Sequence, residues 1–310
     1  MIKHILSITD LTAKEIWQIF SVAKGSKKNI HSNALKNKTM VMLFEKPSLR
    51  TKLSFDIGFS QLGGHSVYFG PGEVGLGKRE SIADVAKVIT SMADLIVARV
   101  FNHEHLEELA KYSKAPVINA LSDLEHPCQA MTDFFTVWES KGKLKGLTIS
   151  YVGDGENNVA HSLCLGSAML GINFRCASPE GYFLNKQVVQ KAKEMGGNIL
   201  ETEDPKTAVL GADVVATDTW VSMGDSDKER RMKLFRPYQV NEKLMQFAKK
   251  NAVFLHCLPA HRGDEVSANV IDGPKSRVFQ EAENRLHVQK ALLIHIWGFT
   301  KAKTSGNLLP

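Results

Sequence analysis

One short polar run in the sequence has residue types suited to binding an anion. Ser48-Leu49-Arg50-Thr51 follows an apolar run that ends at Phe44, and Pro47 stands directly before it. The N-terminus of a helix presents backbone amides with partial positive charge, and Ser, Thr and Arg side chains add donors for phosphate oxygens. The alternative is an ordinary serine cap beside a solvated arginine. The run therefore indicates a phosphate site only where other residues agree with it.

Three further segments agree. Arg99 stands near the end of the apolar run 95–100, and open parallel sheets bind ligands at the carboxyl ends of their strands. His126-Pro127-Cys128-Gln129 brings an imidazole and an amide to the start of a helical pattern, although a lone histidine is more often structural. Arg285, at the end of Glu281-Ala282-Glu283-Asn284-Arg285, is equally compatible with a solvated helix residue.

Two glycine-rich runs resemble nucleotide-binding loops but depart from them. Gly153-Asp154-Gly155-Glu156-Asn157-Asn158 lacks the third glycine of a dinucleotide fingerprint, and no acid ends the next strand. Gly72-Glu73-Val74-Gly75-Leu76-Gly77-Lys78-Arg79 has Arg79 where a P-loop needs a hydroxyl for magnesium. We interpret the first as a tight turn and the second as a glycine-rich loop.

The elements that must position these residues alternate along the chain. Apolar runs predict strands, and helical patterns separate them, so βαβ units with parallel sheets are expected. A capping box at Thr12-Ala13-Lys14-Glu15 predicts the first helix. The polar, glycine-punctuated run 139–146 is the best boundary between two halves. The predicted strands lie at 39–44, 65–69, 95–100, 116–119, 147–152, 173–177, 198–200, 214–217 and 253–255, and the main helices near 50–61, 81–91, 103–112, 129–138 and 281–297.

Length and composition set the class of protein. The chain has 310 residues, 43% of them hydrophobic, which suits two globular α/β domains. The net charge is +6, but basic residues are spread among acidic ones, so no nucleic-acid role is expected. Four scattered cysteines indicate reduced thiols rather than disulfides or zinc. No signal or membrane-spanning segment is recognisable, and a cytoplasmic location is expected.

Together the motifs resemble those of ornithine carbamoyltransferases, in the aspartate/ornithine carbamoyltransferase superfamily. Besides the runs at Ser48, Arg99, His126 and Glu281, two more appear in the family's order: Asp218-Thr219-Trp220-Val221-Ser222-Met223-Gly224 and His256-Cys257-Leu258-Pro259. The resemblance covers nearly the whole chain. It implies two doubly wound parallel-sheet domains joined by helices: a carbamoyl-phosphate domain at 1–138, completed by about 281–310, and an ornithine domain at 147–280. It also implies a homotrimer or a multiple of trimers.

The resemblance implies that the enzyme converts carbamoyl phosphate and ornithine to citrulline and phosphate in arginine metabolism, by direct attack of the neutral side-chain amine. The residues it would use to catalyse the reaction are Arg99, His126, Cys257 and Arg285. Those implied to bind carbamoyl phosphate are Ser48, Leu49, Arg50, Thr51, Arg99, His126, Gln129, Leu258 and Arg285. Those implied to bind ornithine are Asn158, Asp218, Ser222, Met223 and Cys257, and no metal or organic cofactor is expected.

Two residues depart from the family's pattern, and other functions stay open. Lys52 replaces an arginine and loses its bidentate fork, and Gly75 stands where many relatives carry a polar side chain. The acceptor could be putrescine, aspartate or an acetylated ornithine. A protein that binds carbamoyl phosphate or nucleic acid without catalysis is the alternative from another class. Asp218 with the Ser222-Met223 backbone favours free ornithine, because an α-ammonium and a carboxylate would each find a partner.

Overall fold

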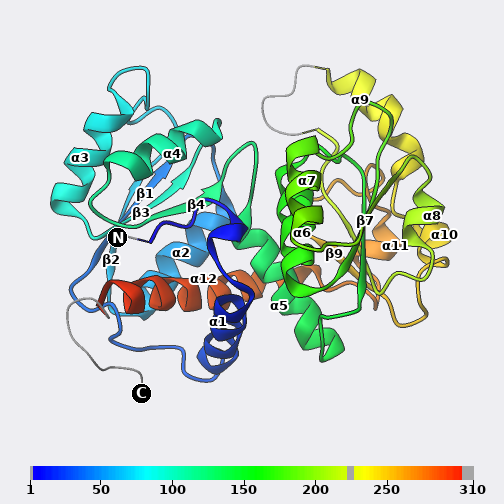
Figure 1. Cartoon of the computed structure of the whole chain (residues 1–310), viewed down its shortest axis with the longest axis horizontal. Coiled ribbons are helices and arrows are strands. Elements are labelled where there is room, and N and C mark those ends of the chain that lie inside the picture. Colours follow the sequence, from blue (N-terminus) through cyan, green and yellow to red (C-terminus); the bar gives the residue numbers. More distant parts are fainter. Residues whose placement is uncertain (1–2, 222–226, 302–310) are drawn as a thin grey trace. The chain divides into compact units, whose positions relative to one another are not determined.

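The computed structural model describes residues 3–221 and 227–301, with side chains described as far as residue 298. The chain folds into two compact units (Figure 1). Unit 1 comprises Met1–Cys128 with Arg285–Pro310, and unit 2 comprises Gln129–Asn284. The chain passes from one unit to the other within two helices, α5 (Pro127–Lys141) and α12 (Val278–Lys301). The predicted domain limits at residues 138, 147 and about 281 stay a prediction.

Unit 1 is built on a parallel four-stranded sheet with the strand order β2-β1-β3-β4. The helices α3 and α4 pack on one face, where their apolar residues form a single core with β1, β3 and β4. The helix α2 lies on the other side of this sheet (Figure 1). The elements of unit 1 are α1 (Ala13–Ser26), β1 (Thr39–Phe44), α2 (Leu49–Gln61), β2 (His65–Phe69), α3 (Ile82–Met92), β3 (Leu95–Arg99), α4 (His103–Tyr112) and β4 (Val117–Leu121), preceded by a 3-10 turn (Ile8–Asp10).

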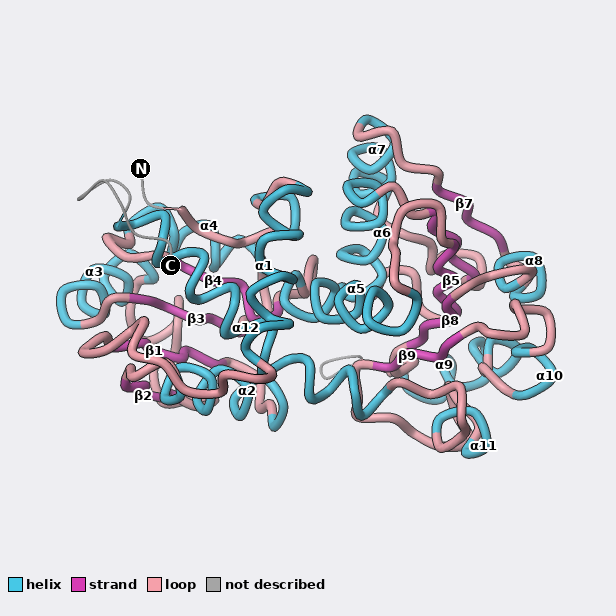
Figure 2. The backbone as a smooth tube through the Cα atoms, turned by 90° about the horizontal axis from the view of Figure 1, so that it is seen from below, coloured by secondary structure: helices cyan, strands magenta, loops and turns pink. Residues whose placement is uncertain are grey.

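Unit 2 is built on a parallel five-stranded sheet with the order β7-β6-β5-β8-β9 (Figure 2). The helices α8, α9, α10 and α11 contribute to one core with this sheet, and α6 packs with α7. The elements of unit 2 are β5 (Thr148–Val152), α6 (Asn158–Leu170), β6 (Asn173–Ala177), α7 (Lys186–Glu194), β7 (Ile199–Thr202), α8 (Pro205–Val209), β8 (Val214–Thr217), α9 (Lys228–Phe235), a 3-10 turn (Arg236–Tyr238), α10 (Glu242–Met245), β9 (Val253–His256) and α11 (Ala268–Ile271), besides most of α5.

Side-chain caps fix where several helices begin. The predicted capping box is present: the Glu15 amide donates to Thr12 Oγ1, and the Thr12 amide donates to Glu15 Oε2 at 2.7 Å. Ser48 caps α2, and Asn157 caps α6 through a 2.8 Å hydrogen bond from the Val159 amide. Because both of these helices follow a central strand directly, their N-termini lie at the carboxyl edges of the two sheets.

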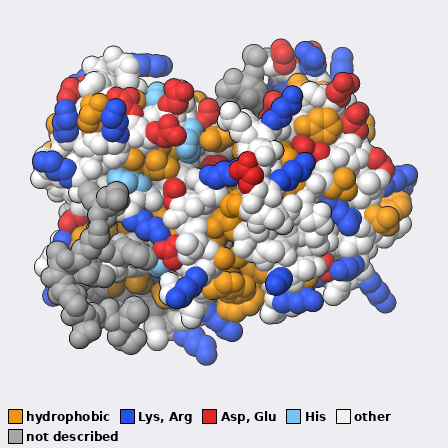
Figure 3. Space-filling model, viewed as in Figure 1, with side chains coloured by type: hydrophobic (Ala, Val, Ile, Leu, Met, Phe, Trp, Pro, Cys, Tyr) orange, Lys and Arg blue, Asp and Glu red, His pale blue; other side chains and the backbone are white. Residues whose placement is uncertain are grey.

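The fold-class prediction is confirmed: both sheets are parallel, helices alternate with strands, and every predicted strand is present to within two residues at each end. All four cysteines, which lie within the described ranges, are free thiols. Lysine and arginine side chains are interspersed with acidic ones on the face shown in Figure 3. Among the described helices, none combines the length and the hydropathy needed to span a membrane.

Candidate active site

The predicted anion-binding residues of unit 1 lie at the carboxyl edge of its sheet. The strands β1, β3 and β4 are neighbours, and Phe44 at the end of β1 is in register with Arg99 at the end of β3. Ser48 follows β1 and accepts the Thr51 amide at 3.3 Å, which sets the start of α2. The Leu49 side chain is 67% exposed, so its backbone is the part suited to an anion.

Residues from four separate segments of unit 1 meet at this edge. Arg285, on α12, donates through Nη2 to Thr51 Oγ1 at 3.1 Å, and both side chains are buried. His126 is buried too. Burial, followed by the nearby charges of Arg285, Arg99 and Arg50, holds the pKa of His126 well below its ordinary value. The imidazole is therefore neutral, and it stands in a strongly positive field that would attract an anion.

A hydrogen-bonded turn positions His126, and its residues were missed in the sequence. The Ser122 amide donates to the Glu125 carbonyl at 3.0 Å, and the Glu125 amide donates to Ser122 Oγ at 3.2 Å. Asn119 Nδ2 donates to the Glu125 carbonyl at 3.3 Å, and Cys128 Sγ donates to the Asn119 carbonyl at 3.4 Å. Burial raises the pKa of Cys128 to about 12, so this thiol keeps its proton. An asparagine inside β4 is an irregularity that could have flagged the turn.

The two residues that depart from the family pattern have local explanations. The Lys52 ammonium lies over the Tyr68 ring, 3.5 Å from its centroid, so its charge makes a cation–π contact. Gly75 has φ +67°, a left-handed conformation that side chains other than glycine, asparagine and aspartate rarely adopt. A Cβ there would also approach Arg79 Cβ to 2.9 Å. The backbone of this loop therefore favours glycine.

In unit 2, a carboxylate, an amide and a thiol gather at the carboxyl edges of three neighbouring strands. Asn157 follows β5, Asp218 follows β8 and Cys257 follows β9. Asp218 accepts Asn157 Nδ2 at 2.9 Å, Cys257 Sγ at 3.1 Å and the Thr219 amide at 2.8 Å. Burial, followed by the charge of Asp218, raises the pKa of Cys257 well above its ordinary value. The thiol is therefore a hydrogen-bond donor and not a thiolate nucleophile.

Two adjacent asparagines stand at the start of α6. Asn157 Nδ2 donates to Asp218 and caps α6, and the predicted Asn158 is the first residue of that helix. The neighbouring Asp154 forms a buried ion pair with Arg231, whose Nε donates to the Trp220 carbonyl at 2.7 Å. The run 153–158 is thus a tight turn, as predicted, and its Asp154 forms an ion pair with Arg231 of α9. The predicted residues Ser222 and Met223 lie outside the described residues.

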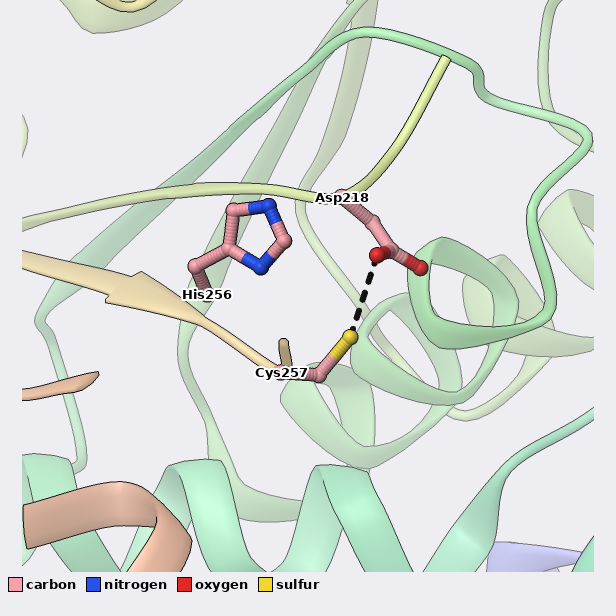
Figure 4. A group of neighbouring side chains, drawn as sticks. All are labelled: Asp218, His256 and Cys257. Carbon is pink, nitrogen blue, oxygen red and sulfur yellow. Dashed lines mark hydrogen bonds between the residues drawn. The ribbon is translucent and has the colours of Figure 1, made fainter. Parts of the chain in front are cut away.

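Asp218, His256 and Cys257 have ligand atoms within 4.8 Å of one another, a spacing compatible with a metal ion (Figure 4). However, His256 Nδ1 accepts the Leu258 amide at 2.9 Å, and its Nε2 lies 3.2 Å from Glu265 Oε1. Both ring nitrogens are therefore engaged, and coordination would have to break one of these bonds. The arrangement favours a structural role for this imidazole and a polar role for the other two groups.

Comparisons with known proteins give the family. The model of the aspartate/ornithine carbamoyltransferase carbamoyl-P binding domain matches residues 3–139, and that of the Asp/Orn binding domain matches residues 145–296. The chain belongs to the aspartate/ornithine carbamoyltransferase family. Its activity is thus that of a carbamoyltransferase, and the family predicted from the motifs is confirmed.

Individual relatives agree over nearly the full length. The ornithine carbamoyltransferase of Methanocaldococcus jannaschii is 50% identical over 302 residues, which cover 95% of this chain and 99% of the relative. The anabolic ornithine carbamoyltransferase of Pyrococcus furiosus is 47% identical over 308 residues, which cover 96% of this chain and 98% of the relative. The alignment with the solved structure of the Pyrococcus furiosus enzyme covers 96% of this chain and 97% of that chain, with a TM-score of 0.91. The alignment with the Thermus thermophilus ornithine carbamoyltransferase, which is 41% identical, covers 96% of this chain and 99% of that chain, with a TM-score of 0.88.

Proposed function

We propose that this carbamoyltransferase transfers the carbamoyl group of carbamoyl phosphate to the side-chain amine of ornithine and releases citrulline and phosphate. The observation that carries the proposal is the division of chemistry between the units. Unit 1 gathers three guanidinium groups about a neutral imidazole, and unit 2 gathers a carboxylate with an amide and a thiol. The relatives named above are ornithine carbamoyltransferases, which supports the same acceptor.

The donor is assigned to the positive cluster of unit 1. Ser48, Arg50, Thr51 and Arg99 would hold the phosphate, because hydroxyls, guanidiniums and the amides at the start of α2 are all donors to phosphate oxygens. Thr51, Arg99 and His126 would donate to the carbamoyl oxygen, with Arg285 beside them. The side-chain oxygen of Gln129 and the backbone carbonyl of Leu258 would accept hydrogen bonds from the carbamoyl NH2.

The acceptor is assigned to unit 2. Asp218 would pair with the α-ammonium of ornithine, and Asn158 would contribute to binding both the α-amino and carboxylate groups, with the Ser222 and Met223 backbone completing the carboxylate site. Cys257 would line the pocket. Putrescine offers no carboxylate to these donors, and the second carboxylate of aspartate would be repelled by Asp218. An acetylated ornithine would lose the positive charge that Asp218 pairs with.

The chemistry requires a neutral amine and a stabilised oxyanion. The same guanidinium charges that lower the pKa of His126 would disfavour a protonated amine at the carbamoyl carbon, so the reactive form is selected. Attack places negative charge on the carbamoyl oxygen, and each fixed donor to such an oxyanion contributes about 3–4 kcal/mol. The C–O bond to phosphate then breaks, the amine nitrogen gives up a proton that the phosphate can accept, and Arg50 and Arg99 stabilise the departing phosphate. These groups suffice for direct transfer without a covalent enzyme intermediate.

The assembly and the physiological direction form the rest of the proposal. We expect a homotrimer or a multiple of trimers, acting in arginine metabolism. Because one relative is named anabolic, citrulline formation is the direction we favour. The molecular mass in solution tests the assembly, and rates measured from ornithine and from citrulline test the direction.

The acceptor assignment is tested with carbamoyl phosphate and a panel of amines: ornithine, putrescine, aspartate and N-acetylornithine. Removing either polar end of ornithine should lower kcat/KM on the order of 100-fold, because a buried group of the site is then left unpaired. Putrescine carbamoylated as fast as ornithine would overturn the assignment.

A further inference from the structure

The amide of Gln129 lies between two buried carboxylates, and these fix its orientation. Gln129 Nε2 donates to Asp133 Oδ1 at 2.7 Å and to Glu281 Oε1 at 2.8 Å, and all three side chains are at most 3% exposed. Gln129 and Asp133 are four residues apart on α5, so they share one face of that helix. An ionised carboxylate only accepts hydrogen bonds. The NH2 end of Gln129 must therefore face both acids, and its carbonyl oxygen Oε1 points away from them.

The second oxygen of Glu281 holds a different segment. Glu281 Oε2 accepts the His256 backbone amide at 3.1 Å, and the His256 ring in turn accepts the Leu258 amide at 2.9 Å. Leu258 has φ +58°, which is uncommon for a residue with a branched side chain. These two hydrogen bonds help to hold the direction of the backbone at Leu258. One carboxylate, through its two oxygens, connects the side chain of Gln129 to the segment that carries the Leu258 carbonyl.

We propose that Glu281, assisted by Asp133, is a specificity-determining positioning residue that makes unit 2 select a donor bearing an NH2 group. The inference rests on the proposed function, in which Gln129 and Leu258 accept hydrogen bonds from the carbamoyl NH2. Glu281 orients both acceptors together. A donor with a methyl group in place of NH2 cannot donate a hydrogen bond to either acceptor, and a polar site rejects an isostere in this way.

A pair of stable donor analogues isolates this effect. Phosphonoacetamide carries an NH2 group on its carbonyl carbon, and 2-oxopropylphosphonate carries a CH3 group at the same place. Calorimetry measures the binding of each analogue in the absence of the acceptor amine. The test variant is Glu281→Gln, which keeps one acceptor oxygen where the carboxylate accepts from both Gln129 Nε2 and the His256 amide. The double variant with Asp133→Asn goes further, because Gln129 can then turn its oxygen toward an amide NH2. Asp133→Asn alone is the milder variant should Glu281→Gln fold poorly.

A matched control lies on the same two helices. Glu139, on α5, accepts hydrogen bonds from Gln280 Nε2 at 3.0 Å and Asn284 Nδ2 at 2.8 Å, both on α12, so it links the same two helices through other residues. Glu139→Gln therefore tests whether any lost carboxylate between these helices has the same effect. Its ratio of the two dissociation constants should stay within about twofold of the wild type.

The expected result is a loss of preference for the amide analogue. In Glu281→Gln, the dissociation constant of 2-oxopropylphosphonate divided by that of phosphonoacetamide should fall about tenfold, which corresponds to about 1.4 kcal/mol. The fall should come from weaker binding of phosphonoacetamide alone. The double variant should fall further, and Asp133→Asn should fall less. Equal weakening of both analogues, an unchanged ratio, or a wild type that does not prefer the amide would each overturn the inference. The panel of amines tests the acceptor in a separate experiment. If that panel contradicts ornithine as the acceptor, the ratio of the two analogue dissociation constants still tests the role of Glu281.

Discussion

Asp218→Asn is the substitution that most sharply separates the acceptor site from the donor site. The change conserves shape but removes the negative charge proposed to hold the α-ammonium of ornithine. It also leaves one acceptor oxygen where the carboxylate now accepts from Asn157, Cys257 and Thr219. Asn157 cannot rotate its amide to compensate without losing the cap on the Val159 amide.

The magnitude follows from the kind of bond that is lost. A hydrogen bond to a charged group contributes about 1.5–3 kcal/mol, which corresponds to roughly a 10- to 150-fold change in affinity. The KM for ornithine should rise by that factor at saturating carbamoyl phosphate. The affinity for phosphonoacetamide should change less than about twofold, because its proposed ligands are other residues.

The assay is steady-state citrulline formation with ornithine varied, together with calorimetry of phosphonoacetamide. Asp213→Asn is a matched control, since Asp213 is also a buried acid of unit 2 but pairs with Lys249 and accepts the Thr148 amide. It should lower stability and leave the ornithine KM unchanged. An unaltered ornithine KM in Asp218→Asn, or an equal loss of affinity for donor and acceptor, would refute the placement of ornithine.

Three further predictions concern unit 1. Arg99→Ala should lower kcat by about 10²- to 10³-fold with little change in the thermal unfolding temperature, and near-wild-type turnover would refute its role. Arg285→Gln should raise the pKa of His126, moving the imidazole titration followed by NMR to higher pH; an unmoved titration would contradict the electrostatic account. Burial raises the pKa of Glu15, but hydrogen bonds, first that from Lys3, bring it down to about 2. Because the folded-state pKa is depressed, Glu15→Gln should lower the free energy of unfolding by about 1 kcal/mol at pH 7, and this difference should shrink as the pH falls from 4.5 toward 2. Urea unfolding at several pH values checks this, and a pH-independent difference would count against it.

The parallel fold was predictable because its strands are short apolar runs between helical patterns. The carboxyl-edge rule then placed Arg99 and His126 correctly at the edge of one sheet, since each follows a buried strand. No local pattern could show that Arg285 donates to Thr51, because 234 residues separate them.

Other contacts depended on geometry that residue types do not encode. Asn157 and Asn158 are identical in kind, and the sequence did not show that Asn157 caps α6 and donates to Asp218. The hydrogen bonds from Gln129 to Asp133 and Glu281 could not be predicted from the sequence for a similar reason. Glu281 begins a predicted helix, and its burial and its contact with Gln129 depend on α5, which is distant along the chain.

The central claim is that the donor phosphate is bound by Arg50 and Arg99 while the acceptor is bound by Asp218. The most direct test is a crystal structure with a bisubstrate mimic in which a phosphonoacetyl group is joined to the side-chain nitrogen of ornithine. The account predicts the phosphonate against Arg50 and Arg99 and the α-ammonium against Asp218. A mimic bound away from these three residues would contradict it.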